Sequence, residues 1–328
     1  MTAFTRRTFL GAALCMAALP AWAQAAGAYP NGRPIRLIVP YTPGGGTDSV
    51  ARSIAAKITA QAGWSVVVEN RPGAGGNIGM DLVAKTKPDG FMLGLGQTAN
   101  LAINPALLPV MPFNAEKDFE VVAMIASLPV VLVVKANSRW HTLADLVKDA
   151  RAQPGVIKQA LAGSGTVGHL AGELLAYQAK FEVLNVPYRG AAPALNDLLG
   201  DSTDYMFATP QAAQEMIKGK VLRALAVTSR TRLPILPDVP TVAESGFDGF
   251  EAVDWKALVA PAGTPQEVVQ TINGVVEKVL ADPTTVTMFT AEGSTAMGGS
   301  TQDAQRYILD EQKKWARLIR EANIKTAQ

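Results

Sequence analysis

Apolar and polar positions alternate along this chain in two rhythms. Short apolar runs rich in Val, Ile and Leu recur from Ile35 onward, and segments with the spacing of an amphipathic helix separate them. This alternation predicts strands and helices in turn, the pattern of an α/β protein. Strands are predicted over 35–39, 65–70, 91–96, 119–126, 129–135, 156–162, 182–188, 204–209, 221–229 and 252–260.

Helix boundaries follow from capping residues and prolines. Helices are predicted over 48–57, 78–85, 191–199, 211–218 and 302–322, with three more starting near 142, 168 and 265. Thr142 is expected to be an N-cap completed by Asp145, and Pro265 is expected to be the first residue of its helix. The proline-rich segments 105–112 and 232–240 are expected to be irregular. Trp315 lies on the apolar stripe of the last helix and is expected in the core.

One break in the alternation indicates two lobes. The apolar runs 119–126 and 129–135 follow each other with no helix between them, so the chain is expected to cross between lobes there. A length of 328 residues also exceeds what one core usually covers. The predicted division is 28–128 with 248–328 for the first lobe and 129–247 for the second.

The first residues predict an export signal. Arg6 and Arg7 form a twin-arginine pattern, an apolar stretch from Leu10 to Leu19 follows, and Ala21-Trp22-Ala23 fits a cleavage site, so residues 1–23 are assigned as a signal peptide. The apolar stretch is too short to span a bilayer. The only cysteine, Cys15, lies inside this segment, so the mature chain has no thiol chemistry. Arg6 and Arg7 also account for the whole formal charge of +2, and a neutral mature chain argues against nucleic-acid binding.

Two glycine turns carry the candidate chemistry. The first run, Ile35 to Val39, leads through Pro40 and three glycines at 44–46 into a helix, and a second turn of the same build spans 163–168. A strand that turns into a helix start points backbone N–H groups and the helix dipole at one place, which suits a carboxylate or phosphate. Asp48 is expected to be the N-cap of the first helix, and the hydroxyls of Thr47, Ser164 and Thr166 are candidate donors.

Three other kinds of chemistry can be weighed. A dinucleotide-binding fingerprint is matched by Gly163-x-Gly165-x-x-Gly168, with the acidic residue Glu182 beyond it. The alternative function is therefore an exported, nucleotide-dependent oxidoreductase. Absorbance of a bound cofactor would reveal it. A twin-arginine signal can export folded cofactor enzymes, but the mid-chain position of the turn and a periplasm poor in free NAD weaken that interpretation. A hydrolase would need Ser164 with His169 or His141, but no Gly-x-Ser-x-Gly motif is present. Two distant histidines without cysteine give no metal cluster.

Seven motifs together resemble one family, the Bug (TctC-type) periplasmic solute-binding receptors of tripartite tricarboxylate transporters. The likeness runs over the whole mature chain and keeps the family's order of motifs. The motifs are Pro40-Tyr41-Thr42-Pro43-Gly44-Gly45-Gly46-Thr47-Asp48, Glu69-Asn70-Arg71-Pro72-Gly73-Ala74-Gly75-Gly76-Asn77, Lys87-Pro88-Asp89-Gly90, Gly163-Ser164-Gly165-Thr166, Val186-Pro187-Tyr188-Arg189-Gly190, Leu236-Pro237-Asp238-Val239-Pro240-Thr241 and Ala260-Pro261-Ala262-Gly263-Thr264-Pro265.

The resemblance implies a two-lobe, type II periplasmic-binding (Venus flytrap) fold, with no catalysis and no cofactor. It implies a monomer in the periplasm that holds a small carboxylate for the membrane components of a tripartite tricarboxylate transporter or for a signalling partner. The ligand could be a di- or tricarboxylate, an acidic amino acid or an aromatic acid. The implied ligand-binding residues are Tyr41, Pro43, Gly44, Gly45, Gly46, Thr47 and Asp48 of the first turn, Gly75, Gly76 and Asn77 of a middle turn, Ser164, Gly165 and Thr166 of the second-lobe turn, and, by position, Thr209 and Asp254.

The chain departs from the family pattern at two places. Trp255-Lys256-Ala257-Leu258 has a lysine where the family rarely has one and lacks a glycine before the leucine, and 200–204 lacks a second glycine. These departures bear on ligand identity. One hypothesis is that Lys256 meets a distal anionic group of the ligand.

Overall fold

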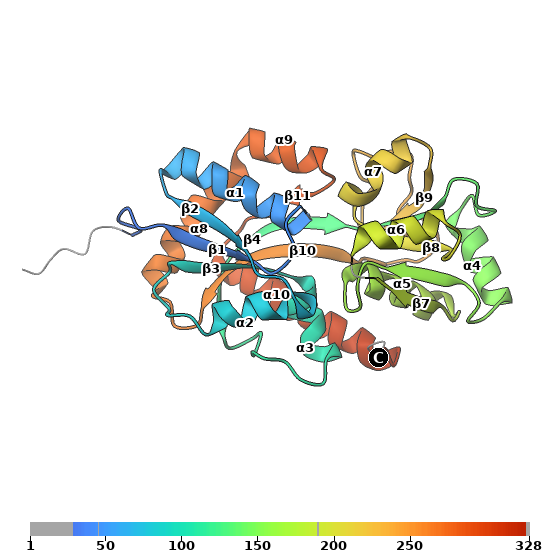
Figure 1. The fold of residues 1–328 in the computed structure, drawn as a ribbon, viewed down its shortest axis with the longest axis horizontal. Helices are drawn as coiled ribbons and strands as arrows, with labels where there is room; N and C mark the ends of the chain where they lie inside the picture. Colours follow the sequence, from blue (N-terminus) through green and yellow to red (C-terminus); the bar gives the residue numbers. More distant parts are fainter. Residues whose placement is uncertain (1–28, 45, 189, 326–328) are drawn as a thin grey trace, which may run out of the picture.

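Two β-sheets lie side by side, each with helices on both faces (Figure 1). The computed structural model describes residues 29–44, 46–188 and 190–325. The expected signal peptide and Gly45 lie outside the described residues. The two-lobe α/β fold predicted from the sequence is confirmed.

The first sheet is mixed and six-stranded, in the order β11-β4-β10-β3-β1-β2. Strand β1 pairs in parallel with β2 and β3, whereas β10 runs antiparallel between β3 and β4. Its strands are β1 (Ile35–Val39), β2 (Val66–Asn70), β3 (Met92–Gln97), β4 (Phe119–Pro129), β10 (Val253–Pro261) and β11 (Thr295–Ala296).

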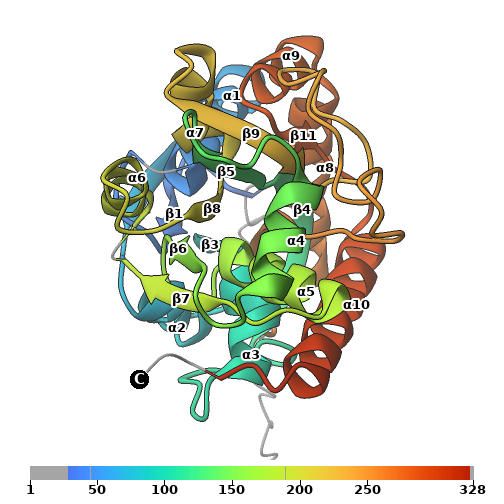
Figure 2. The same ribbon diagram turned by 90° about the vertical axis from the view of Figure 1, so that its right-hand side faces the viewer.

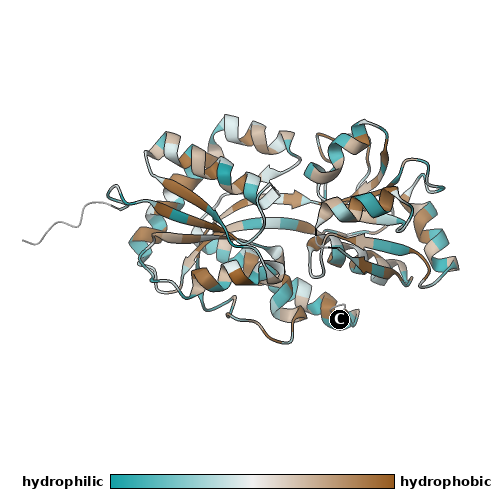
Figure 3. Cartoon of the chain, viewed as in Figure 1, coloured by the Kyte–Doolittle hydropathy of each residue, from teal (hydrophilic) through white to brown (hydrophobic). Residues whose placement is uncertain are grey.

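Brown, hydrophobic residues recur along the strands and helices of this lobe in Figure 3. Because side chains alternate along each strand, the apolar residues of the sheet divide between two cores. Leu37 and Leu93 pack with α1 and α8 on one face, and Ile38 and Met92 pack with α2 and α10 on the other. Trp315 is fully buried, as expected. The helical segments of this lobe are α1 (Gly46–Ala62), η1 (Ala74–Gly76), α2 (Asn77–Ala84), η2 (Ala99–Ile103), α3 (Asn104–Leu107), α8 (Gln266–Ala281), α9 (Pro283–Ala291) and α10 (Thr301–Glu321).

The second sheet has five strands in the order β7-β6-β8-β5-β9, and Figure 2 shows this lobe end-on. Helices α4 and α5 cover one face, and α6 and α7 cover the other. Its strands are β5 (Val131–Lys135), β6 (Lys158–Leu161), β7 (Leu184–Pro187), β8 (Tyr205–Ala208) and β9 (Leu222–Val227). Its helices are α4 (Leu143–Ala152), α5 (Val167–Ala179), α6 (Ala191–Leu199) and α7 (Pro210–Lys218).

The chain passes between the sheets in two places. Strand β4 leads through Val130 directly into β5, and the segment 228–252 returns from β9 to β10. Thr228 joins the two passages, because its hydroxyl accepts a hydrogen bond from the Val130 N–H at 2.9 Å and donates one to the Ala252 carbonyl at 2.6 Å. These passages position the two lobes against each other.

Local predictions differ from the structure at a few ends. Thr142 and Asp145 form the expected capping box, but Pro265 is the N-cap of α8 and not its first residue. The segment 105–112 was expected to be irregular, but its first residues belong to α3, which follows a π-helical turn, η2. Helix α9 was not predicted, although Asp282 caps it and Pro283 is its first residue. In the part of the chain that the structure describes, no helix is both long and apolar enough to cross a bilayer.

Candidate functional site

Helix starts gather where the two lobes face each other. In the first lobe, β1 leads into the glycine turn before α1, and β2 leads through η1 into α2. In the second lobe, β6 leads through 162–166 into α5, and β8 leads through Thr209 into α7. The carboxyl ends of parallel strands and the N-termini that follow them are where open α/β sheets bind ligands.

Asp48 holds the first turn from inside the helix. Helix α1 begins at Gly46, so Asp48 lies in its first turn, and the expectation that it is the N-cap was wrong. Its Oδ2 atom accepts hydrogen bonds from the Gly44 N–H at 2.9 Å and Arg52 Nε at 3.0 Å, and Oδ1 accepts one from Asn70 at 2.9 Å. Burial alone would raise the pKa of Asp48, but these hydrogen bonds outweigh it and lower the pKa. The ionised carboxylate therefore fixes the turn.

Tyr41 and Thr47 connect the first turn to its neighbours. The Tyr41 hydroxyl donates to the Gly75 carbonyl at 3.0 Å, and Thr47 Oγ1 donates to Gln97 Oε1 at 2.7 Å. Burial raises the pKa of Tyr41, and the nearby charge of Asp254 raises it further. Tyr41 thus contacts the middle turn, whereas Pro43 and Gly44 are exposed.

The middle turn needs its glycines. Gly75 and Gly76 have φ values of 64° and 91°, a region that favours glycine. A Cβ on Gly76 would lie 2.8 Å from the Tyr41 hydroxyl. Asn77 begins α2, is buried, and its Oδ1 accepts a hydrogen bond from Asn104 at 3.3 Å. The backbone therefore passes close beneath Tyr41.

The second-lobe turn uses several of its own polar groups. Thr166 is the N-cap of α5, and its hydroxyl also donates to the Gly163 carbonyl at 2.8 Å. The Gly165 N–H donates to Nδ1 of His169 at 3.2 Å. Ser164 is exposed beside them. The Thr166 hydroxyl and the Gly165 N–H, both expected to meet the ligand, thus have partners within the turn.

The turns of the two lobes come together across the seam, the region where the starts of α1 and α2 face the starts of α5 and α7. A Cβ on Gly165 would lie 2.8 Å from Asn104 Oδ1 of the first lobe, and one on Gly75 would lie 3.2 Å from Asn104 Nδ2. A Cβ on Gly46 would lie 3.9 Å from Gln211 Oε1 of the second lobe. Asn104 therefore sits between the middle turn and the second-lobe turn, and Gln211 reaches the start of α1.

Asn104 and Gln211 were missed by sequence reasoning. Both amide atoms of Gln211 are buried and have no hydrogen-bond partner among the described residues. Thr209 precedes it as the N-cap of α7, and its side chain makes no capping hydrogen bond. The available signal was position: Gln211 follows a predicted strand end, and such ends meet at the edge of a sheet.

Lys256 and Asp254 form a buried ion pair on β10. Lys256 is only 1% exposed, and it lies opposite Gln97 in the register of β10 and β3. The amino group that was hypothesised to meet a distal anionic group is therefore engaged by the Asp254 carboxylate.

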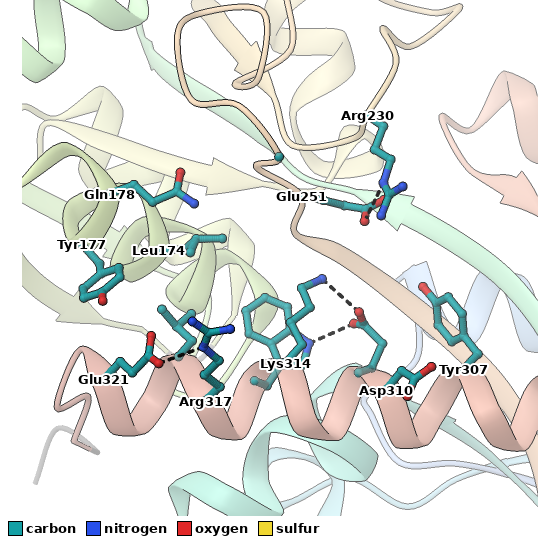
Figure 4. Close-up of a pocket in the computed structure, with 14 residues that line it drawn as sticks. Leu174, Tyr177, Gln178, Arg230, Glu251, Tyr307, Asp310, Lys314, Arg317 and Glu321 are labelled. Atoms are coloured by element: carbon teal, nitrogen blue, oxygen red, sulfur yellow. Dashed lines mark hydrogen bonds and ion pairs between the residues drawn. The ribbon is translucent and has the colours of Figure 1, made fainter.

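A separate groove of about 900 Å³ lies between α5 and α10, away from the glycine turns (Figure 4). Its charged side chains already have partners, because Arg230 pairs with Glu251 and Arg317 with Glu321. Glu311 is buried below it and accepts hydrogen bonds from the indole N–H groups of Trp255 and Trp315. The charged side chains of this groove are paired, whereas the region between the lobes offers helix N-termini and the Gln211 amide, which has no partner among the described residues. Among the described residues, no cluster of His, Cys, Asp and Glu could hold a metal ion.

Comparisons with known proteins agree on one family. Residues 50–324 match the family model described as the tripartite tricarboxylate transporter family receptor, TctC. A UPF0065 protein in the tcbD-tcbE intergenic region of Pseudomonas sp. strain P51 is 41% identical over 324 residues, covering 98% of this chain and 96% of the relative. These matches give no support to the oxidoreductase alternative.

Two solved structures share the whole fold. R. palustris Rpa4515 with adipate has a TM-score of 0.84 and 34% identity, over 90% of this chain and 99% of that one. The periplasmic binding protein BugD has a TM-score of 0.80 and 33% identity, over 89% of this chain and 98% of that one.

Proposed function

The chain belongs to the TctC family of tripartite tricarboxylate transporter receptors, and from this membership we propose that it is an exported receptor that captures a small carboxylate between its lobes. It releases the ligand unchanged to the membrane components of a transporter of that type or to a signalling partner. The proposed ligand-binding residues are those of the three turns, with Thr209 and Asp254. Binding of adipate by a relative of 34% identity supports a carboxylate as the ligand class.

The observation that carries this proposal is the meeting of helix N-termini across the seam. The starts of α1 and α2 face the starts of α5 and α7, with Asn104 and Gln211 between them. The first N–H groups of a helix have no partner within that helix, so an anion held there gains hydrogen bonds and a favourable dipole. The buried amide of Gln211, unpartnered among the described residues, is typical of a group that a ligand completes.

Plausible affinities follow from these contacts. Hydrogen bonds to a charged group contribute about 1.5–3 kcal/mol each. Four such bonds total about 6–12 kcal/mol before the costs of association and ordering are subtracted, the range in which the roughly 8 kcal/mol of micromolar binding lies. No arginine is needed for such a site.

A panel of organic acids tests the proposal. Ligand binding raises the melting temperature by mass action, so thermal shifts of the mature chain with mono-, di- and tricarboxylates should identify binders, and calorimetry should give their affinities. We expect at least one acid to bind and to be recovered chemically unchanged. Failure of every acid to shift the melting temperature, or turnover of a bound acid, would contradict the proposal.

A further inference from the structure

The Asp254–Lys256 pair leaves one oxygen without a partner. Asp254 Oδ2 accepts a hydrogen bond from the Lys256 amino group, but Oδ1 is buried and has no hydrogen-bond partner among the described residues. A buried carboxylate oxygen without a donor is unfavourable in the protein alone. We therefore expect Asp254 Oδ1 to accept a hydrogen bond from a donor that is not part of the described residues, such as a ligand.

The pair lies on the face of the first sheet that meets the glycine turn. Trp255 points the other way, since its indole contacts Glu311 and Tyr307 of α10. Side chains alternate along a strand, so Asp254 and Lys256 both lie on the α1 side. There Lys256 is in register with Gln97 of β3. Gln97 in turn accepts a hydrogen bond from the hydroxyl of Thr47 in the first turn of α1.

The two members of the pair differ in access. The Lys256 side chain is 2% exposed, whereas that of Asp254 is 13% exposed. The acidic member therefore faces the site, and the basic member sits behind it. A second carboxylate of the ligand would meet the negative end of the pair, which would repel it.

Resting on the proposed function, we infer that Asp254 selects carboxylates that also carry a hydrogen-bond donor, a hydroxyl or amino group, over acids without one. The carboxylate of the ligand binds the helix N-termini, and its donor satisfies Asp254 Oδ1. Lys256 orients Asp254 through their ion pair and does not itself contact the ligand. Lys256 is thus a positioning residue, which replaces the hypothesis that it meets a distal anionic group.

Matched series of acids test this selectivity. Each series contains an unsubstituted acid, its hydroxy derivative and its amino derivative: propanoate, lactate and alanine; butanoate with its hydroxy and amino forms; succinate, malate and aspartate. Calorimetry on the wild-type chain should show a preference of about tenfold or more for a donor-bearing member over its unsubstituted partner in the series that fits the site. The hydroxy and amino arms show which donor is used.

Two variants connect the preference to Asp254. Asp254→Asn removes the charge and should reduce the preference for the donor-bearing acid by about tenfold in its amino form. The double variant Asp254→Leu with Lys256→Met removes the pair without leaving a buried charge alone, so it should fold and lose the preference for both forms. Asp201→Asn is the matched control, because Asp201 forms an ion pair with Lys135 at the far end of β5.

The outcomes separate this inference from the proposed function. If wild type binds an unsubstituted acid as tightly as its hydroxy and amino partners in every series, the inference is wrong and the receptor function stands. An unchanged preference in a folded double variant would also overturn it. Binding of no acid at all by wild type would overturn both.

Discussion

Nδ1 of His169 accepts a hydrogen bond from the backbone N–H of Gly165 at a distance of 3.2 Å. His169 is 2% exposed, and an Nδ1 atom that accepts a hydrogen bond carries no proton, so the hydrogen-bond geometry assigns a neutral imidazole with its proton on Nε2. The histidine that a hydrolase would use as a base thus has a structural role, because it fixes the turn that faces the first lobe.

His169→Ala should therefore weaken ligand binding, although the His169 side chain does not contact the ligand. The Gly165 N–H loses its buried partner, which should lower the free energy of unfolding by about 1–3 kcal/mol and the affinity by roughly tenfold as the turn loses its fixed shape. Urea unfolding and calorimetry with the tightest acid of the panel measure both. His169→Asn keeps an acceptor near the Nδ1 position and should recover most of the affinity; equal losses in the two variants would contradict this role.

Gly165→Ala should block closure of the lobes. Gly165 has a φ of +74°, and a Cβ there would lie 2.8 Å from Asn104 Oδ1, whose own amide is bound to Asn77. Gly155→Ala is the control, since its φ of +69° gives the same backbone strain but its nearest atom is Glu182 Oε2 at 3.8 Å. Both variants should lose about 1–2 kcal/mol of stability. Only Gly165→Ala should lose tenfold or more in affinity by calorimetry; similar affinities of the two variants would refute the steric contact.

Asp48 should make stability depend on acid pH. Its pKa is lowered in the folded chain, so its contribution is fully present above the ordinary aspartate value of about 3.9 and is lost as the pH falls through the lower folded value. Urea unfolding of wild type and Asp48→Asn across a pH series should show a gap that is constant near neutrality and narrows below about pH 4. A gap that stays constant into that acid range would show that the charge of Asp48 does not hold the turn.

The sheets and turns were predictable because their causes are local. Strand alternation at Leu37 and Ile38 places residues in different cores, and glycine turns between strand and helix follow from backbone conformations that favour glycine. The passage between the sheets at Val130 was predictable because two apolar runs adjoin there. The helix cap at Asp48 was misread, since α1 starts two residues earlier, at Gly46.

The seam itself could not be read from the chain, because it depends on contacts between distant segments. Asn104 and Gln211 matter through their neighbours Gly165 and Gly46 on the opposite lobes, which no periodicity reveals. A sequence shows that Asp254 and Lys256 share a strand face, but their pairing and burial depend on how Gln97 and α1 cover them. Helix α9 had a readable signal in Asp282-Pro283 that was overlooked.

Thr228→Val tests whether a hydroxyl holds the two interlobe passages together. Thr228 is completely buried, so apolarity alone would favour the valine, which has nearly the same shape. The hydroxyl, however, accepts a hydrogen bond from the Val130 N–H and donates one to the Ala252 carbonyl, and valine removes both hydrogen bonds. We expect a loss of about 1–3 kcal/mol in the free energy of unfolding, measured by urea unfolding. Thr228→Ser keeps the hydroxyl and removes one methyl, a loss of about 0.8 kcal/mol. A valine variant as stable as wild type would show that packing, and not this hydrogen-bonded hydroxyl, holds the passages.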